Sequence, residues 1–63
     1  MTQYVGLALA NGGSVIINPA LVAAIEAHGN GSIIHLAVPT SGGDHLTYIA
    51  AGTPKEVMKS LGL

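Results

Sequence analysis

Glycine divides this chain into short apolar segments, and this spacing restricts the folds that the chain can adopt. Glycines recur at Gly12–Gly13, Gly29–Gly31, Gly42–Gly43 and Gly52, with apolar stretches between them. Short apolar segments bounded by turn-forming residues are typical of strands connected by hairpins. No linker, low-complexity tract or repeat interrupts the sequence, so we expect a single domain over residues 1–63.

The N-terminal segments predict a β-hairpin. Alternating apolar residues indicate a first strand at about residues 3–10, and "SVIIN" indicates a second at 14–18. Asn11–Gly13 lies between them. Asn-Gly tolerates the positive φ angles of a type I′ turn, so we expect that turn here.

Two further segments have a strand pattern. Residues 32–38 and 44–50 are rich in β-branched residues and alternate in polarity. Alternation places Ile34 and Leu36 on one face of the first of these strands and His35 on the other. The polar segment Pro39–Gly43 is expected to form the loop between them.

The segment "NPALVAAIEAHG" permits two interpretations. Asn18 suits a helix cap, Pro19 a first helical position and Gly29 a helix end, so residue propensities favour a helix. The alternative is one helical turn at Pro19–Val22, followed by a strand at 23–28 and a tight hairpin at "HGNG".

The C-terminal sequence "TPKEVMKSLGL" predicts a helix at about residues 54–61. Thr53 and Glu56 have the spacing of a capping box around Pro54. Gly62 is typical of the residue that ends a helix. The predicted fold is therefore α+β and mostly β, with one C-terminal helix.

The order of these features resembles the FlbD family of small flagella-associated bacterial proteins. Turn-forming and apolar positions carry the resemblance, namely Asn11, Gly12, Val15, Asn18, Pro19, Leu21, Val22, Ile25, Glu26, Ile34, Leu36, Glu56 and Val57. The resemblance implies a small antiparallel β-meander of four to five short strands with a C-terminal helix. It therefore favours a strand at 23–28, and it argues for fold far more than for function.

Size and charge restrict the partners. The chain has 63 residues, is 49% hydrophobic and 8% charged, and contains no cysteine. A chain this short and apolar is expected to cover its surface by forming a homo-oligomer. Two lysines, no arginine and two aromatic residues argue against nucleic acid as a partner. With no membrane-length apolar run and no basic N-terminal region, we expect no membrane partner, no signal peptide and a cytoplasmic location.

Catalytic and metal-binding motifs are weak. His28, His35 and His45 lie seven and ten residues apart, without the short spacings of zinc sites, although His35 and His45 are candidates for cross-strand neighbours. Ser41, Asp44 and His45 lack a nucleophile elbow. The paired glycines match no phosphate-binding pattern. We therefore expect no enzymatic activity, no metal site and no cofactor.

The start of the C-terminal helix is the candidate binding site. Backbone N–H groups at a helix N-terminus attract anions, and Lys55 would add a positive charge. The candidate ligand-binding residues are Lys55, Thr53, Tyr48, His45 and His35, gathered where subunits meet.

The predicted function is a non-catalytic, homo-oligomeric binding protein that sequesters an anionic, nucleotide-like small molecule at a subunit interface. Phage-encoded sponge proteins, which sequester nucleotide-derived immune signals, resemble such a protein in size, neutrality and reliance on assembly. The alternative is a protein–protein adaptor, as the FlbD resemblance implies, that uses a strand edge or a helix face.

Overall fold

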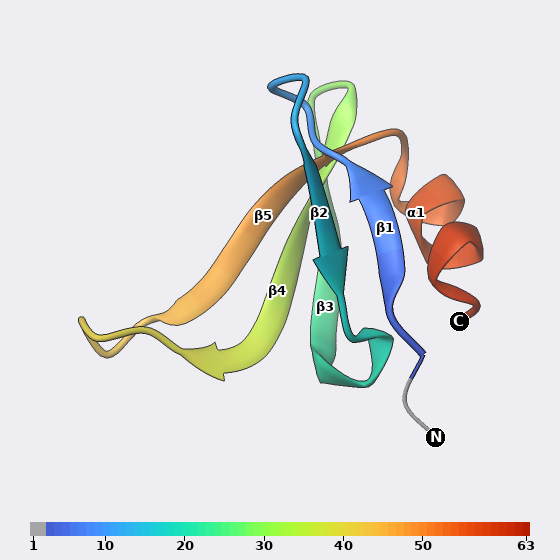
Figure 1. Cartoon of the computed structure of the whole chain (residues 1–63). Coiled ribbons are helices and arrows are strands. Elements are labelled where there is room, and N and C mark those ends of the chain that lie inside the picture. Colours follow the sequence, from blue (N-terminus) through green and yellow to red (C-terminus); the bar gives the residue numbers. More distant parts are fainter. Residues whose placement is uncertain (1–2) are drawn as a thin grey trace.

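A computed structural model describes residues 3–63. The chain forms five strands in two antiparallel sheets, followed by one α-helix (Figure 1). The elements in chain order are β1 (Val5–Ala8), β2 (Ser14–Ile17), the 3₁₀ turn η1 (Pro19–Leu21), β3 (Val22–His28), β4 (Gly31–Pro39), β5 (His45–Ala51) and α1 (Pro54–Leu61). The predicted mostly-β fold with a C-terminal helix is confirmed.

The expected meander is divided into two sheets. Strands β3, β4 and β5 form a three-stranded meander, whereas β1 and β2 form a separate two-stranded sheet. A single bridge between Leu9 and Ala50 connects the two, and the Ala10 N–H donates to the Ile49 carbonyl at 2.9 Å. The first hairpin therefore joins the edge of β5 only beyond the end of β1.

The first hairpin is shorter than predicted. Strands expected at 3–10 and 14–18 are observed at Val5–Ala8 and Ser14–Ile17. Pairing stops at Val5 opposite Ile17, because the next residue, Asn18, leaves the strand to cap η1. The other three strands agree with their predicted bounds to within one residue at each end.

The turn of this hairpin differs from the predicted type I′. That turn needs positive φ at two central residues, but in the described chain only glycines have positive φ, so Asn11 does not. The Gly12 N–H donates to the Leu9 carbonyl at 3.1 Å, and Gly12 has a φ of 93°. A three-residue loop ending in a left-handed glycine replaces the two-residue turn.

The segment at 19–28 is a helical turn followed by a strand, so the helix favoured by propensity is wrong. The Asn18 side chain accepts a hydrogen bond from the Ala20 N–H at 3.0 Å, and η1 ends after one turn. Strand β3 then pairs with β4, which places Ile25 opposite the fully buried Ile34. Pairing with β4 and packing of Ile25 against the core outweigh the helix propensity of the alanines.

The core lies between the two sheets and α1. Its buried apolar side chains come from β1, β2, β4, β5 and α1, and they are Leu7, Ile17, Ile34, Leu36, Ala50, Val57 and Leu61. Among the described residues one polar side chain is buried, that of Ser32, whose hydroxyl donates to the Gly52 carbonyl at 2.8 Å. This bond ties β4 to the segment that leads into α1.

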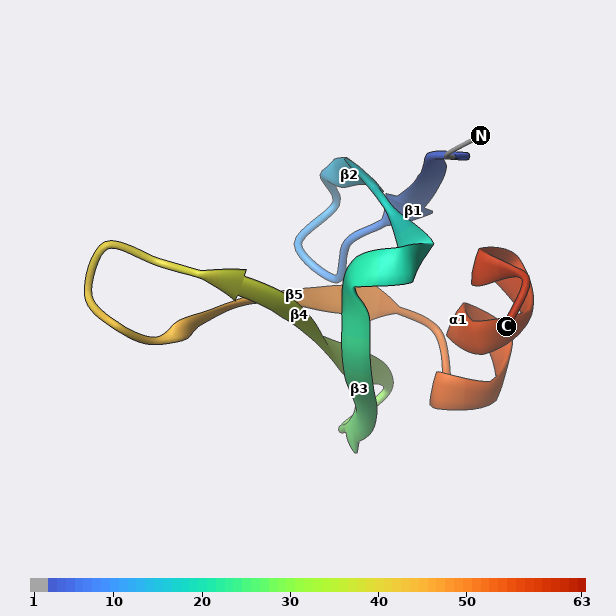
Figure 2. The same ribbon diagram turned by 90° about the horizontal axis from the view of Figure 1, so that it is seen from below.

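Helix α1 has the predicted bounds, capping box and end. The Thr53 side chain accepts from the Glu56 N–H, and Gly62 ends the helix in the left-handed conformation. Figure 2 shows the loop between β4 and β5 at the opposite end of the molecule from α1. None of the helices in residues 3–63 has the length and apolarity that a membrane crossing requires.

Candidate functional site

All three histidines project from one face of the three-stranded sheet. Register places Ala24, His35 and Thr47 side by side across β3, β4 and β5, and the core-facing residues Ile34 and Tyr48 belong to the opposite set. Because side chains alternate along a strand, His28 and His45 also lie on the face turned away from the core. We call this side of the sheet the outer face.

On the outer face, His35 contacts side chains from both neighbouring strands. Its Nε2 lies 2.6 Å from Oε1 of Glu26 on β3, and its Nδ1 lies 2.7 Å from Nε2 of His45 on β5. The two imidazole rings are 4.9 Å apart at their centroids and tilted by 43°. Glu26, His35 and His45 therefore form a continuous chain of hydrogen bonds across three strands.

The carboxylate in this chain sets the roles of the ring nitrogens. A carboxylate only accepts, so the His35 Nε2–H donates to Glu26. When His35 is neutral, its Nδ1 is left with a lone pair directed at His45. The side chain of His35 is 24% exposed and that of Glu26 is 58% exposed, so the cluster is open to solvent.

At the start of α1, the Thr53 backbone N–H is already hydrogen-bonded to a carboxylate of the same chain, that of Glu56. Oε1 of Glu56 accepts from the Thr53 N–H at 3.0 Å, while the Thr53 hydroxyl lies 3.1 Å from the same oxygen. These hydrogen bonds from Thr53 lower the pKa of Glu56 below its usual value. An incoming anion at this helix start would meet the charge of Glu56.

The five predicted ligand-binding residues fall into three places within one chain. His35 and His45 contact each other on the outer face, whereas Tyr48 lies opposite the core residue Ile34. Thr53 and Lys55 belong to the start of α1, beyond the far end of β5. At about 3.3 Å per residue, His45 and the end of β5 are roughly 20 Å apart. Within one chain, the histidine pair and the start of α1 are therefore separate places.

A groove of about 210 Å³ opens between the first hairpin and the β4–β5 hairpin. Among residues 3–63, no charged side chain lines it. Three of its apolar residues, Tyr4, Ile16 and Leu21, are 66%, 72% and 40% exposed. We call this surface the apolar groove, and its apolar lining residues include Tyr4, Ile16, Leu21, Val38, Leu46 and Tyr48.

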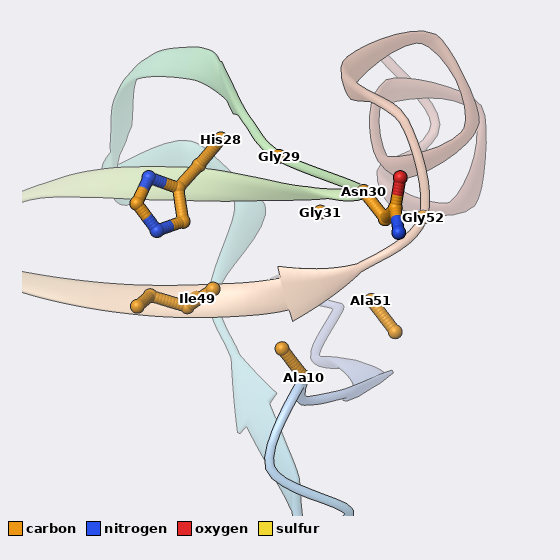
Figure 3. A pocket seen from close by; sticks show the side chains of 8 residues that line it. All are labelled: Ala10, His28, Gly29, Asn30, Gly31, Ile49, Ala51 and Gly52. Carbon is orange, nitrogen blue, oxygen red and sulfur yellow. The ribbon is translucent and has the colours of Figure 1, made fainter.

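A second, wider depression of about 510 Å³ lies at the hairpin between β3 and β4 (Figure 3). Most of its lining is glycine and alanine, contributed by this hairpin, by β5 and by Ala10. His28 and Asn30 are its polar side chains. Neither Thr53 nor Lys55 belongs to its lining, so it is separate from the predicted anion site.

Sequence reasoning did not identify Glu26 as a site residue. The signal was present in the "HGNG" turn, because a hairpin with His28 opposite Gly31 sets the register of β3 against β4. That register places Glu26 opposite Ile33, one pair along the same face from His35. Glu26 becomes a neighbour of His35 only if residues 23–28 form a strand, which was one of the two interpretations of this segment.

Comparison with known proteins leaves the site to be interpreted from its own geometry. No protein-family model, curated protein or solved structure matches the chain.

Proposed function

We propose that this protein is a non-catalytic binding protein that works as a homo-oligomer, with the apolar groove as the contact between copies. The observation that carries this proposal is the uncharged groove with three large apolar side chains, Tyr4, Ile16 and Leu21, exposed at its lining. Large apolar surface without charge is typical of a surface that another molecule covers.

The total surface supports association. A compact monomer of 6.3 kDa is expected to expose about 3,700 Å² by the usual scaling of area with mass. This chain exposes 4228 Å². A standard interface buries about 800 Å² on each partner, which is about a fifth of that surface. One two-fold interface over the groove would bury more surface than the difference between the observed and the expected area.

The proposal is tested by placing a charge in the groove. Ile16→Glu puts a carboxylate on the most exposed of the large apolar side chains, and Met58→Glu does the same on α1, where Met58 is 44% exposed. We expect Ile16→Glu to weaken self-association in analytical ultracentrifugation and Met58→Glu to leave it unchanged. Equal association constants for wild type and both variants, with normal circular dichroism, would reject the groove as the contact.

For the bound molecule, the first candidate is an anionic, nucleotide-like small molecule held between subunits. Lys55 is exposed and forms no ion pair with an acidic residue within residues 3–63, and the His35–His45 pair lies on the solvent-exposed outer face. Assembly would have to bring these residues together with Thr53 and Tyr48. The Glu56 carboxylate at the helix start opposes this candidate.

Native mass spectrometry of protein purified from cells tests this candidate directly. A retained small-molecule adduct, together with a nucleotide that raises Tm, would support it. The Tm shift should disappear in Lys55→Glu and in His45→Ala. If both variants keep the full shift, the proposed pocket is wrong.

The second candidate is a protein partner, as in the adaptor that the FlbD resemblance suggests. Strand β3 pairs only with β4 among the described strands, so one of its edges is not paired with a strand. Strand addition uses such an edge. A protein that carries no adduct, responds to no nucleotide and captures a defined protein would favour the adaptor.

A further inference from the structure

We propose that His35 and His45 together bind a divalent transition metal, with Glu26 positioning His35. The spacing of ten residues between the histidines gives no indication of such a site in the sequence. The structure brings Nδ1 of His35 and Nε2 of His45 to 2.7 Å of each other. In this structure the two nitrogens share a hydrogen bond. When the proton of His45 is on Nδ1 instead, both nitrogens carry lone pairs and can bind one metal that prefers nitrogen ligands.

The distance between the nitrogens fits this role with a small adjustment. Zinc lies about 2.0–2.1 Å from histidine nitrogens, so two ligands at a tetrahedral angle are about 3.3 Å apart. The pair must therefore open by about 0.6 Å from the observed 2.7 Å. His45 is exposed and lies where the register between β4 and β5 is irregular. Its ring can move outward without disturbing the core.

Glu26 fixes which ring nitrogen of His35 carries the proton. Its carboxylate lies 2.6 Å from Nε2 of His35, so the proton of a neutral His35 is held on Nε2 and the lone pair on Nδ1. A histidine that donates one ring N–H to a carboxylate while its other nitrogen binds metal is a recurring arrangement in metal sites. Glu26 is therefore a positioning residue that selects the ligating tautomer.

The surroundings leave room for the remaining ligands. His35 and His45 line a depression of about 380 Å³, together with Leu36 and the small side chains of Ala23, Ala24 and Ala37. In residues 3–63, no group of three or more histidine or acidic side chains is placed to hold one metal ion. One chain thus supplies two ligands, and water or a second copy completes the coordination. Such an open site suits Zn²⁺, Ni²⁺ or Cu²⁺ and not the oxygen-preferring Mg²⁺.

The test uses the metal ions alone. Isothermal titration with NiCl₂ and ZnCl₂ measures affinity, and thermal melts followed by circular dichroism measure stabilisation. We expect Tm of the wild-type protein to rise with the logarithm of the NiCl₂ concentration and to be unaffected by MgCl₂. Absence of any heat or Tm shift with both transition metals would overturn the proposal.

The third histidine provides a matched control. His28 lies on the same outer face but makes no side-chain hydrogen bond among those of residues 3–63. Losing one of two linked ligands is expected to weaken binding roughly a hundredfold, so His35→Ala and His45→Ala should each nearly abolish it. His28→Ala should bind as the wild type does. Comparable losses in all three variants would mean separate, single-histidine binding and would refute the paired site.

Two measurements separate loss of the site from loss of folding. The circular dichroism spectra of His35→Ala and His45→Ala without metal should match that of the wild-type protein, so that lost binding cannot be ascribed to unfolding. In the wild-type protein, substoichiometric Cu²⁺ should broaden the imidazole NMR signals of His35 and His45 before those of His28. Broadening of His28 first would contradict the assignment.

The role of Glu26 has a separate readout. Glu26→Ala should lower metal affinity by about tenfold to a hundredfold, the range found for lost carboxylate partners of metal-binding histidines. Glu26→Gln keeps an oxygen that accepts from Nε2–H, so it should recover part of that affinity. If the two variants bind metal as tightly as the wild type, Glu26 has no positioning role.

Discussion

Gly31 is the position at which one added methyl group tests the strand pairing most directly. It begins β4, is buried, and pairs with both His28 and Ala51. A Cβ atom at Gly31 would lie 2.6 Å from the Ala50 carbonyl oxygen, closer than real Cβ atoms approach backbone. Relief of the overlap requires the paired strands β4 and β5 to separate.

The expected loss of stability in Gly31→Ala follows from two opposing terms. Overpacking of this kind costs about 1–3 kcal/mol, and the reduced freedom of the unfolded chain returns about 0.4–1 kcal/mol. The middle of the resulting range, a net loss of about 1.3 kcal/mol, lowers Tm by roughly 5–10 °C in a domain of this size. Thermal melts followed by circular dichroism at fixed protein concentration measure the change.

Gly6→Ala is the matched control for this prediction. Gly6 also lies in a strand, but a Cβ there would have nothing within 4 Å, and its φ is not positive. Only the effect on the unfolded chain remains, so Tm should rise by about 2–6 °C. If Gly31→Ala melts at or above the wild-type temperature, the close approach of β4 and β5 at Ala50 is wrong.

Three further perturbations test the core, the buried polar group and the helix cap. Ile34→Ala, at the fully buried centre of the sheet, should lower the free energy of unfolding by about 2–5 kcal/mol. This loss is a large part of the roughly 3–9 kcal/mol of stability expected for a domain of this size, and urea unfolding measures it. Ser32→Ala leaves the Gly52 carbonyl without its donor and should cost about 1–3 kcal/mol in the same assay; an unchanged midpoint would contradict the bond. Because Thr53 lowers the pKa of Glu56, the capping interaction stabilises the fold above pH 4.5 and is lost as the pH falls below it. The Tm advantage of wild type over Glu56→Gln should therefore shrink in acid, and a constant difference would contradict the capping role.

Local signals in the sequence predicted most of the fold. The helix was predicted with its bounds because its start and end are specified by neighbours, Thr53 with Glu56 at one end and Gly62 at the other. Alternation assigned the faces of β4 correctly, with Ile34 and Leu36 inward and His35 outward. These features depend on residues a few positions apart, so one sequence is sufficient to identify them.

Residue propensities alone do not specify the remaining features. The strand at Val22–His28 forms because it pairs with β4, and only the FlbD resemblance favoured a strand there over the helix that propensity favours. Asn11 accepts from the Gly13 N–H at 2.9 Å through its side chain, which stabilises a loop in which Asn11 needs no positive φ. The contact of Ser32 with Gly52 spans 20 residues and leaves no pattern in the sequence.

Sedimentation velocity across a range of micromolar concentrations tests the central claim most directly, because the proposed function requires copies of the chain to cover the apolar groove. We expect a species heavier than the 6.3 kDa chain, with dissociation on dilution or in Ile16→Glu. A stable, fully folded single subunit at every concentration would contradict the account.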